Sequence, residues 1–161
     1  MTLNIVILAL VTLQRLGELW LSNRNTQRLL AQGGREHGRA HYPLIVAVHA
    51  LWLAVLWWLA PGRPVEALWL ALYVLLQVAR IWVLASLGPR WTTRIIVLPG
   101  APLVKAGPYR FVSHPNYVVV AGEIAVLPLV FGLWPVALIF SSLNAAILAI
   151  RIREENRALS R

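Results

Sequence analysis

Cysteine and aspartate are both absent from this chain of 161 residues, and only six glutamates are present. Without cysteine there are no disulfides, thiolate nucleophiles or cysteine-based metal sites. Without aspartate, the carboxylate clusters that hold Mg²⁺ or carry out two-carboxylate hydrolysis are hard to assemble. No glycine-rich phosphate loop and no serine-centred elbow is found either. His114 has no cysteine or carboxylate at ligand spacing in the sequence, so we expect no metal site.

The residues that are present indicate a membrane protein. Hydrophobic residues make up 59% of the chain, and the mean hydropathy is +0.68. Ordinary soluble domains are less apolar. The length suits one domain, and the hydropathy places that domain in a bilayer. We therefore expect residues 1–161 to form a single membrane-embedded domain.

Five apolar segments predict an all-α integral membrane protein with about five transmembrane helices. They cover residues 3–22, 42–60, 66–87, 117–133 and 134–150. The last two are short and form a helical hairpin that turns at Gly132 and Pro135. Residues 1–87 hold three spans, and residues 88–161 hold a proline-punctuated region, the hairpin and a C-terminal helix. Residues 94–98 are predicted to be extended, and the first span is predicted to be a retained helix because no cleavage site follows it.

The basic residues define a predicted membrane topology. The net charge is +9, and nearly all of the arginines and lysines lie in residues 23–41, residues 88–116 and the tail from Arg151 onward. Such alternation between loops follows the positive-inside rule. We therefore expect the N-terminus outside, these three segments in the cytosol, and a bacterial inner membrane as the location. Because topology explains the charge, we expect no nucleic-acid partner.

Two polar segments are unusual in so apolar a chain. One is GPYRFVSHPNY, from Gly107 to Tyr117, and the other is RIREEN, which begins at Arg151. The first is either a site or a re-entrant turn between membrane helices, since polar groups at a membrane edge need partners. Arg151 and Glu155 are four residues apart on a predicted helix, so they share a face. That pair suits a zwitterionic ligand with an anionic partner, or is a plain salt bridge.

Polar residues within the predicted spans leave two interpretations open. Arg15 and Glu18 are spaced to form a structural ion pair. Four other residues either line a tunnel for a ligand or are hydrogen-bonded packing residues: His49, Gln77, Arg80 and Glu123. Four tryptophans near span ends are predicted to be interface anchors: Trp57, Trp58, Trp91 and Trp134.

The GPYRFVSHPNY segment, the short hairpin and the RIxxE pattern together resemble the isoprenylcysteine carboxyl methyltransferase family. These are integral membrane enzymes that use S-adenosylmethionine and release S-adenosylhomocysteine. Four further segments are similar to a bacterial branch that includes alkylpyrone O-methyltransferases: QRLGEL (14–19), RN (24–25), HYPLIVAVHALWL (41–53) and RWTTRIIVLPG (90–100). The resemblance thus covers nearly the whole chain.

The resemblance implies roles for particular residues. Glu155 would meet the cationic end of the cofactor's amino-acid moiety, and Arg151 would hold the acidic oxygen of the acceptor. The cofactor-binding residues would be Leu103, Val104, Gly107, Tyr109, His114, Pro115, Asn116, Tyr117 and Glu155, and the catalytic residues Arg151 and Glu155. These residues would form a small cytosolic cofactor-binding region.

The acceptor stays open between a carboxylate, as in prenylcysteine, and an enol or phenol hydroxyl, as in an alkylpyrone. Eukaryotic members of the family carry a longer charged tail after the last helix, so we expect a small amphiphile that enters from the bilayer. The alternatives from other classes are a non-catalytic transporter or lipid-binding scaffold, and a membrane reductase with a nicotinamide cofactor. The oligomeric state cannot be predicted from these patterns.

Overall fold

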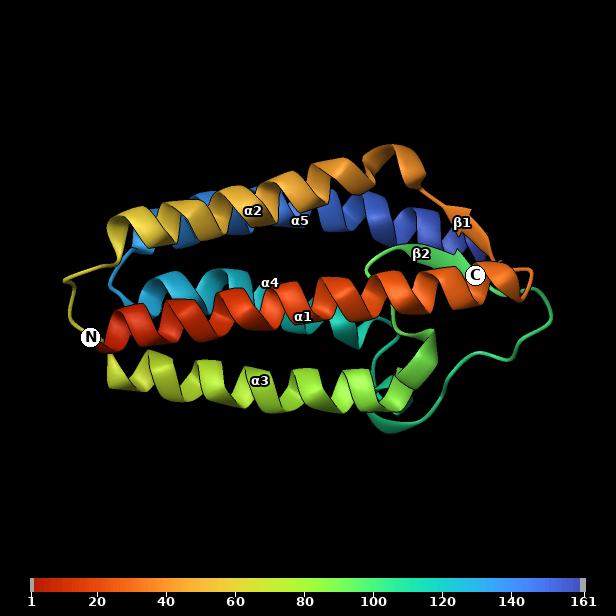
Figure 1. The fold of residues 1–161 in the computed structure, drawn as a ribbon, viewed down its shortest axis with the longest axis horizontal. Coiled ribbons are helices and arrows are strands. Elements are labelled where there is room, and N and C mark those ends of the chain that lie inside the picture. The colour runs from red at the N-terminus through yellow and green to blue at the C-terminus, as the bar shows by residue number, and fades with distance from the viewer. Residues whose placement is uncertain (1, 160–161) are drawn as a thin grey trace.

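Five α-helices lie roughly side by side along the long axis of the molecule (Figure 1). The computed structural model describes residues 2–159. The helices are α1 (Leu3–Ala31), α2 (Tyr42–Leu59), α3 (Ala67–Leu87), α4 (Pro115–Val130) and α5 (Trp134–Ala158). Short 3₁₀ turns precede α2, follow α3 and precede α4: η1 (Arg39–His41), η2 (Gly88–Arg90) and η3 (Gly107–Arg110). Both α1 and α5 continue well beyond the apolar segments that predicted them.

Within residues 2–159, four stretches are long and apolar enough to cross a membrane, by length and composition. They are α1, η1 with α2, α3 with η2, and α5. Helix α4 has only 16 residues, whereas a bilayer span needs about 20. The prediction of a helical membrane protein is therefore confirmed, while a fifth span stays a prediction.

The core forms where α4 packs against α3 and α5, with α1 and α2 closing the other side. Leu8, Trp52 and Ile124 are among its buried residues. The outer surface is also apolar, and Trp58 and Leu68 are each 80% exposed. Apolar residues facing outward all around a bundle mark a surface that contacts lipid.

A small antiparallel sheet joins two loops at the end of the bundle opposite the N-terminus (Figure 1). It consists of β1 (Arg35–His37) and β2 (Ile95–Val97). The extended segment predicted at residues 94–98 is confirmed, but its partner β1 was expected to be a loop, so the chain is not purely helical. Arg94 Nη1 lies 2.6 Å from Glu36 Oε1, and the Arg94 guanidinium lies 4.1 Å from the centre of the Tyr42 ring. These contacts fasten β2 to β1 and to the start of α2.

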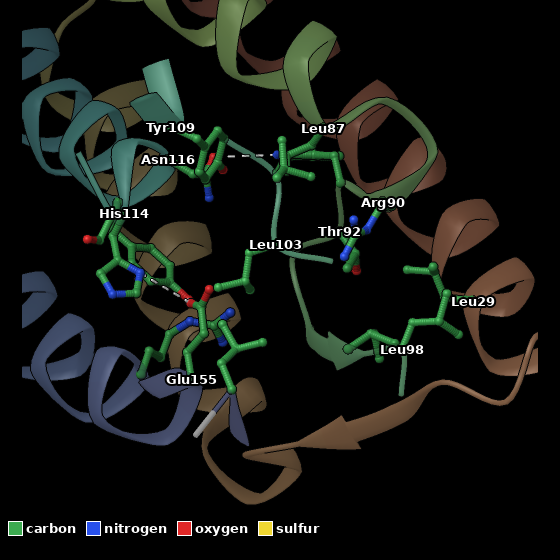
Figure 2. A pocket seen from close by; sticks show the side chains of 17 residues that line it. Leu29, Leu87, Arg90, Thr92, Leu98, Leu103, Tyr109, His114, Asn116 and Glu155 are labelled. Carbon is green, nitrogen blue, oxygen red and sulfur yellow. Dashed lines mark hydrogen bonds and ion pairs between the residues drawn. The ribbon is translucent and has the colours of Figure 1, made fainter. Parts of the chain in front are cut away.

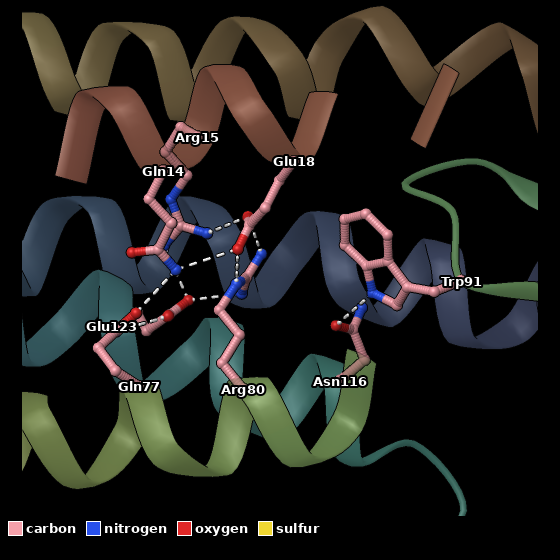
Figure 3. A network of polar contacts seen from close by, with 8 residues as sticks. All are labelled: Gln14, Arg15, Glu18, Gln77, Arg80, Trp91, Asn116 and Glu123. Atoms are coloured by element: carbon pink, nitrogen blue, oxygen red, sulfur yellow. Dashed lines mark hydrogen bonds and ion pairs between the residues drawn. The ribbon is translucent and has the colours of Figure 1, made fainter. Parts of the chain in front are cut away.

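A buried polar network links α1, α3 and α4 in the middle of the bundle (Figure 3). Arg80 donates to both carboxylate oxygens of Glu18 at 2.5 Å and to Glu123 at 2.8 Å. Arg15 donates to Glu123 at 2.8 Å and to Glu18 at 3.2 Å. The predicted Arg15–Glu18 pair is therefore one part of a larger network, which also includes Gln14 and Gln77. Buried charges persist only when they are paired in this way.

Candidate functional site

A cavity of about 150 Å³ lies at the end of the bundle that carries the small sheet (Figure 2). Its lining is about half polar and half apolar, and we call it the polar cavity because it holds the Glu155 carboxylate and is the more polar of two cavities. The ends of α1, α3 and α5, the start of α4 and the loop of residues 91–113 enclose it. Eight residues predicted to form the site line this cavity: Leu103, Val104, Tyr109, His114, Asn116, Tyr117, Arg151 and Glu155. The structure thus brings together two segments that are far apart in the sequence.

Gly107 and Pro115, which were also predicted as cofactor-binding residues, do not line the cavity and shape the chain around it. Gly107 has φ +56°, and a Cβ atom there would lie 2.0 Å from Ser86 Oγ. This left-handed, crowded position favours glycine, because any Cβ atom would force the Ser86 side chain to move. Pro115 is the first residue of α4, where a missing N–H costs nothing. It starts the helix one residue after His114 and so directs Asn116 and Tyr117 to the cavity wall.

The Glu155 carboxylate is held by residues of the GPYRFVSHPNY segment. Tyr117 donates its hydroxyl proton to Glu155 Oε2 at 2.7 Å, and His114 Nδ1 lies 3.7 Å from the same oxygen. His114 stacks on Tyr117 with ring centres 5.6 Å apart, and its Nε2 lies 3.1 Å from Asn156 Oδ1. Burial and the nearby Glu155 carboxylate raise the pKa of the Tyr109 phenol. An anionic oxygen therefore faces the cavity among neutral phenols.

Arg151 is buried, at 4% exposure, and its guanidinium lies 5.8 Å from the centre of the Tyr117 ring. Its Nη2 donates to the Thr93 backbone oxygen at 2.6 Å, whereas its buried Nη1 has no partner among residues 2–159. The expected alternative, a salt bridge between Arg151 and Glu155, is not formed within the described chain. A buried N–H group without a partner is costly, so Nη1 is a donor available to an oxygen atom of a ligand.

A second cavity, of about 270 Å³ and mostly apolar, lies between α1, α2, α4 and α5. It borders on the first, and four residues belong to the walls of both cavities: Trp91, Asn116, Tyr117 and Arg151. Of the four residues considered for a tunnel, His49 and Arg80 line the second cavity, whereas Gln77 and Glu123 lie in the polar network beside it. A polar cavity and an apolar one therefore meet at the Arg151 guanidinium.

Trp91 and Thr93 are site residues that sequence reasoning missed. Trp91 was predicted to be an interface anchor, but it is 2% exposed and lies between the two cavities. Thr93 was assigned no role, yet its carbonyl oxygen holds Arg151. Both belong to the RWTTR segment, which the family resemblance had already picked out. That resemblance was the available signal, because composition alone predicts an anchor for a tryptophan at a helix end.

The apolar helices and the two adjoining cavities describe an integral membrane protein with an internal cavity system at one end of the bundle. Residues 69–161 match the model of the isoprenylcysteine carboxyl methyltransferase (ICMT) family. The uncharacterized protein YpbQ of Bacillus subtilis is 38% identical over 167 residues, covering 96% of this chain and 95% of its own length. An uncharacterized protein of Haemophilus influenzae is 25% identical over 154 residues, covering 91% and 88%. No solved structure matches significantly.

The chain therefore belongs to the ICMT family and is a membrane methyltransferase by family. The matched region begins in α3 and includes the whole GPYRFVSHPNY segment, α4 and α5. The resemblance predicted from those segments is confirmed at the level of the family. The names of the two relatives state no substrate.

Proposed function

We propose that this protein transfers a methyl group from S-adenosylmethionine to an acidic oxygen of a lipophilic acceptor. The observation that carries the proposal is the meeting of a polar and an apolar cavity at Arg151. A methyl transfer needs two ligands whose reacting atoms come within contact distance. One cavity of mixed lining that holds charged groups, and a second, mostly apolar one that shares a wall with it, suit a polar methyl donor and a lipophilic acceptor.

The residues of the polar cavity suit the proposed cofactor. Glu155 supplies a negative charge for the ammonium of its amino-acid moiety, and Tyr117 orients that carboxylate through their 2.7 Å hydrogen bond. Leu103 and Val104 supply apolar surface for an adenine ring. When bound, S-adenosylmethionine supplies an electrophilic methyl group: a lone pair on the acceptor oxygen forms the new O–CH₃ bond, and the electrons of the broken S–CH₃ bond stay on sulfur in S-adenosylhomocysteine.

The cavity is smaller than the ~300 Å³ at which typical small-molecule sites begin. The cavity is open at its mouth, so the whole cofactor would extend beyond the enclosed part or displace part of the wall, and the loop of residues 98–106 is the wall segment we expect to yield. This loop has no regular secondary structure, and Arg90 Nη1 fastens it through one hydrogen bond of 2.8 Å to the Pro102 carbonyl oxygen. A single exposed hydrogen bond contributes about 1 kcal/mol, so the movement is inexpensive.

Arg151 would hold the acceptor oxygen. Its unpaired Nη1 donates to that oxygen, while the bond from Nη2 to Thr93 keeps the guanidinium in place. A guanidinium remains charged at any physiological pH and favours the ionised form of an acid beside it. An acceptor that is already ionised needs no general base, so orientation is the main contribution of the protein.

The apolar cavity would take the chain of the acceptor. Leu16, Leu19 and Leu53 are among its lining residues, and α1 and α2 present apolar side chains to the lipid on either side. An alkylpyrone enol and a prenylcysteine carboxylate both combine a delocalised oxyanion with such a chain. The proposed topology puts the polar cavity and the C-terminus in the cytosol and the N-terminus outside the bacterial inner membrane, because the basic segments lie around that cavity.

The first experiment measures cofactor binding and methyl transfer separately. Purified full-length protein in detergent is titrated with S-adenosylhomocysteine by calorimetry, then incubated with labelled S-adenosylmethionine and a bacterial lipid extract. We expect saturable binding and a labelled, extractable product. Absence of saturable binding would favour a transporter or scaffold, and competition by a nicotinamide dinucleotide would favour a reductase.

Variants of α5 assign the two reactant sites. Arg151→Ala should abolish methyl transfer and leave S-adenosylhomocysteine binding largely intact, whereas Glu155→Ala should abolish both. The matched controls are Arg153→Ala and Glu154→Ala, which remove the same side-chain types from neighbouring positions outside both cavities. Full activity in the purified Arg151 or Glu155 variant would contradict the assignment. The His114→Ala variant should bind S-adenosylhomocysteine more weakly in the same titration, because the Glu155 carboxylate loses the imidazole that lies beside it.

A further inference from the structure

Trp91 occupies the place where the two cavities adjoin. It lines both of them, together with Asn116, Tyr117 and Arg151. If the polar cavity holds the methyl donor and the apolar one the acceptor, the methyl group crosses at this common wall. The residues of the wall are then the nearest neighbours of the sulfur atom that loses the methyl group. This inference rests on the proposed function and adds a residue to it.

The Trp91 side chain is fixed in that position. Its backbone carbonyl accepts a 2.8 Å hydrogen bond from the buried Asn25 amide, and its indole Nε1 lies 3.4 Å from Asn116 Oδ1 (Figure 3). Trp58 and Trp134, by contrast, are 80% and 65% exposed, as expected of tryptophans that anchor a protein at the lipid surface. Trp91 is 2% exposed and packs with Val83 and Val119, so it is no lipid anchor, and it also lines both cavities.

The charges near the wall leave the sulfonium without a favourable partner. Arg151 is a cation and repels a second positive charge nearby. The Glu155 carboxylate is already assigned to the ammonium of the amino-acid moiety. Removing a cation from water without a partner is costly. An aromatic face supplies the missing attraction, and among the aromatic side chains tryptophan binds cations best.

Tyr117 is the other aromatic residue in the wall, but other side chains already lie against its ring. His114 stacks on its ring at 5.6 Å, and the Arg151 guanidinium lies 5.8 Å from the ring centre. We therefore propose that Trp91 binds the sulfonium of S-adenosylmethionine through a cation–π interaction. The product carries an uncharged thioether, so this attraction acts on the methyl donor and disappears after transfer.

The difference in charge between donor and product supplies the test. Full-length wild-type protein and the Trp91→Leu and Trp91→Phe variants are titrated with S-adenosylmethionine and with S-adenosylhomocysteine by calorimetry in detergent. We expect Trp91→Leu to weaken binding of S-adenosylmethionine about tenfold, and of S-adenosylhomocysteine less than twofold. Trp91→Phe keeps an aromatic face and should give an intermediate loss for the sulfonium ligand alone. Trp58→Leu, which removes an exposed tryptophan, should change neither affinity.

Two results would overturn the inference. Equal weakening of both ligands would show that Trp91 merely shapes the cavity, and unchanged affinity for both would show that it does not contact the sulfur end. If Trp91→Leu fails to fold, the comparison of the two ligands on Trp91→Phe decides the question. If wild-type protein binds neither ligand, the proposed function and this inference fail together. If wild-type protein binds both ligands and the Trp91 variants weaken both equally, only this inference fails.

Discussion

Replacement of Glu123 by glutamine is the most direct test of the buried polar network. Glu123 is fully buried, and its two oxygens accept three hydrogen bonds of 2.8 Å, from Arg15, Arg80 and Gln77. All three partners are donors. A carboxylate can satisfy them, whereas the amide of glutamine can offer the two guanidiniums only its one oxygen. Its NH₂ group would then face Gln77, which could accept only by turning its own amide and giving up the 2.8 Å hydrogen bond that it accepts from Gln14.

The expected loss of stability follows from the charges. Two guanidiniums and two carboxylates make the network neutral, so Glu123→Gln leaves one uncompensated positive charge in the bundle. Breaking a buried ion pair from one side costs about 3–5 kcal/mol. The same replacement at Glu154, which makes an exposed ion pair of 3.2 Å with Arg157, should cost less than about 1 kcal/mol.

The free energy of unfolding of each variant is measured by dodecyl sulfate titration in mixed micelles, with far-UV circular dichroism as the signal. A second variant, Arg15→Met with Glu123→Gln, restores neutrality while Arg80 keeps both of its 2.5 Å bonds to Glu18. This double variant should regain at least half of the lost stability. A loss below 1 kcal/mol for Glu123→Gln, or no recovery in the double variant, would refute the account of the network.

Two further replacements test the ends of the bundle. Asn4→Ala should lower the free energy of unfolding by about 1–3 kcal/mol. The reason is that the buried Asn4 amide donates to the Ala60 carbonyl oxygen at 2.7 Å. An unchanged midpoint of thermal unfolding would contradict this prediction. Gly107→Ala should lower both stability and S-adenosylhomocysteine affinity, because its Cβ atom would lie 2.0 Å from Ser86 Oγ. The control is Gly132→Ala, which has a similar φ of +67° with nothing within 4 Å; equal effects at both glycines would refute the clash.

Much of the helical structure could be predicted because hydropathy acts locally. A bilayer requires a run of apolar residues, and the starts of α2, α3 and α5 lie within a residue of the predicted segments. The strand β1 was missed because three polar residues carry no strand pattern of their own. They are extended because β2, nearly sixty residues later in the chain, pairs with them.

The candidate site was predictable only through the family resemblance. Spacing along α5 places Arg151 and Glu155 on one face and favours a salt bridge between them. In the folded protein Arg151 turns to the Thr93 carbonyl and Glu155 to the Tyr117 hydroxyl. Helix periodicity relates neighbours within one helix, whereas these partners come from the segment between η2 and β2 and from α4.

The sequence by itself determined that the chain is a membrane-embedded helical protein of this family, since hydropathy, charge placement and motifs are properties of local segments. Tertiary structure alone decided that a cavity of mixed lining and a mostly apolar one share a wall that includes Arg151, and that Trp91 lies in this wall instead of at the lipid surface. The reason is physical: a cavity is the space left where several helices fail to fill the volume between them. Its position depends on every element around it and is encoded in no single segment.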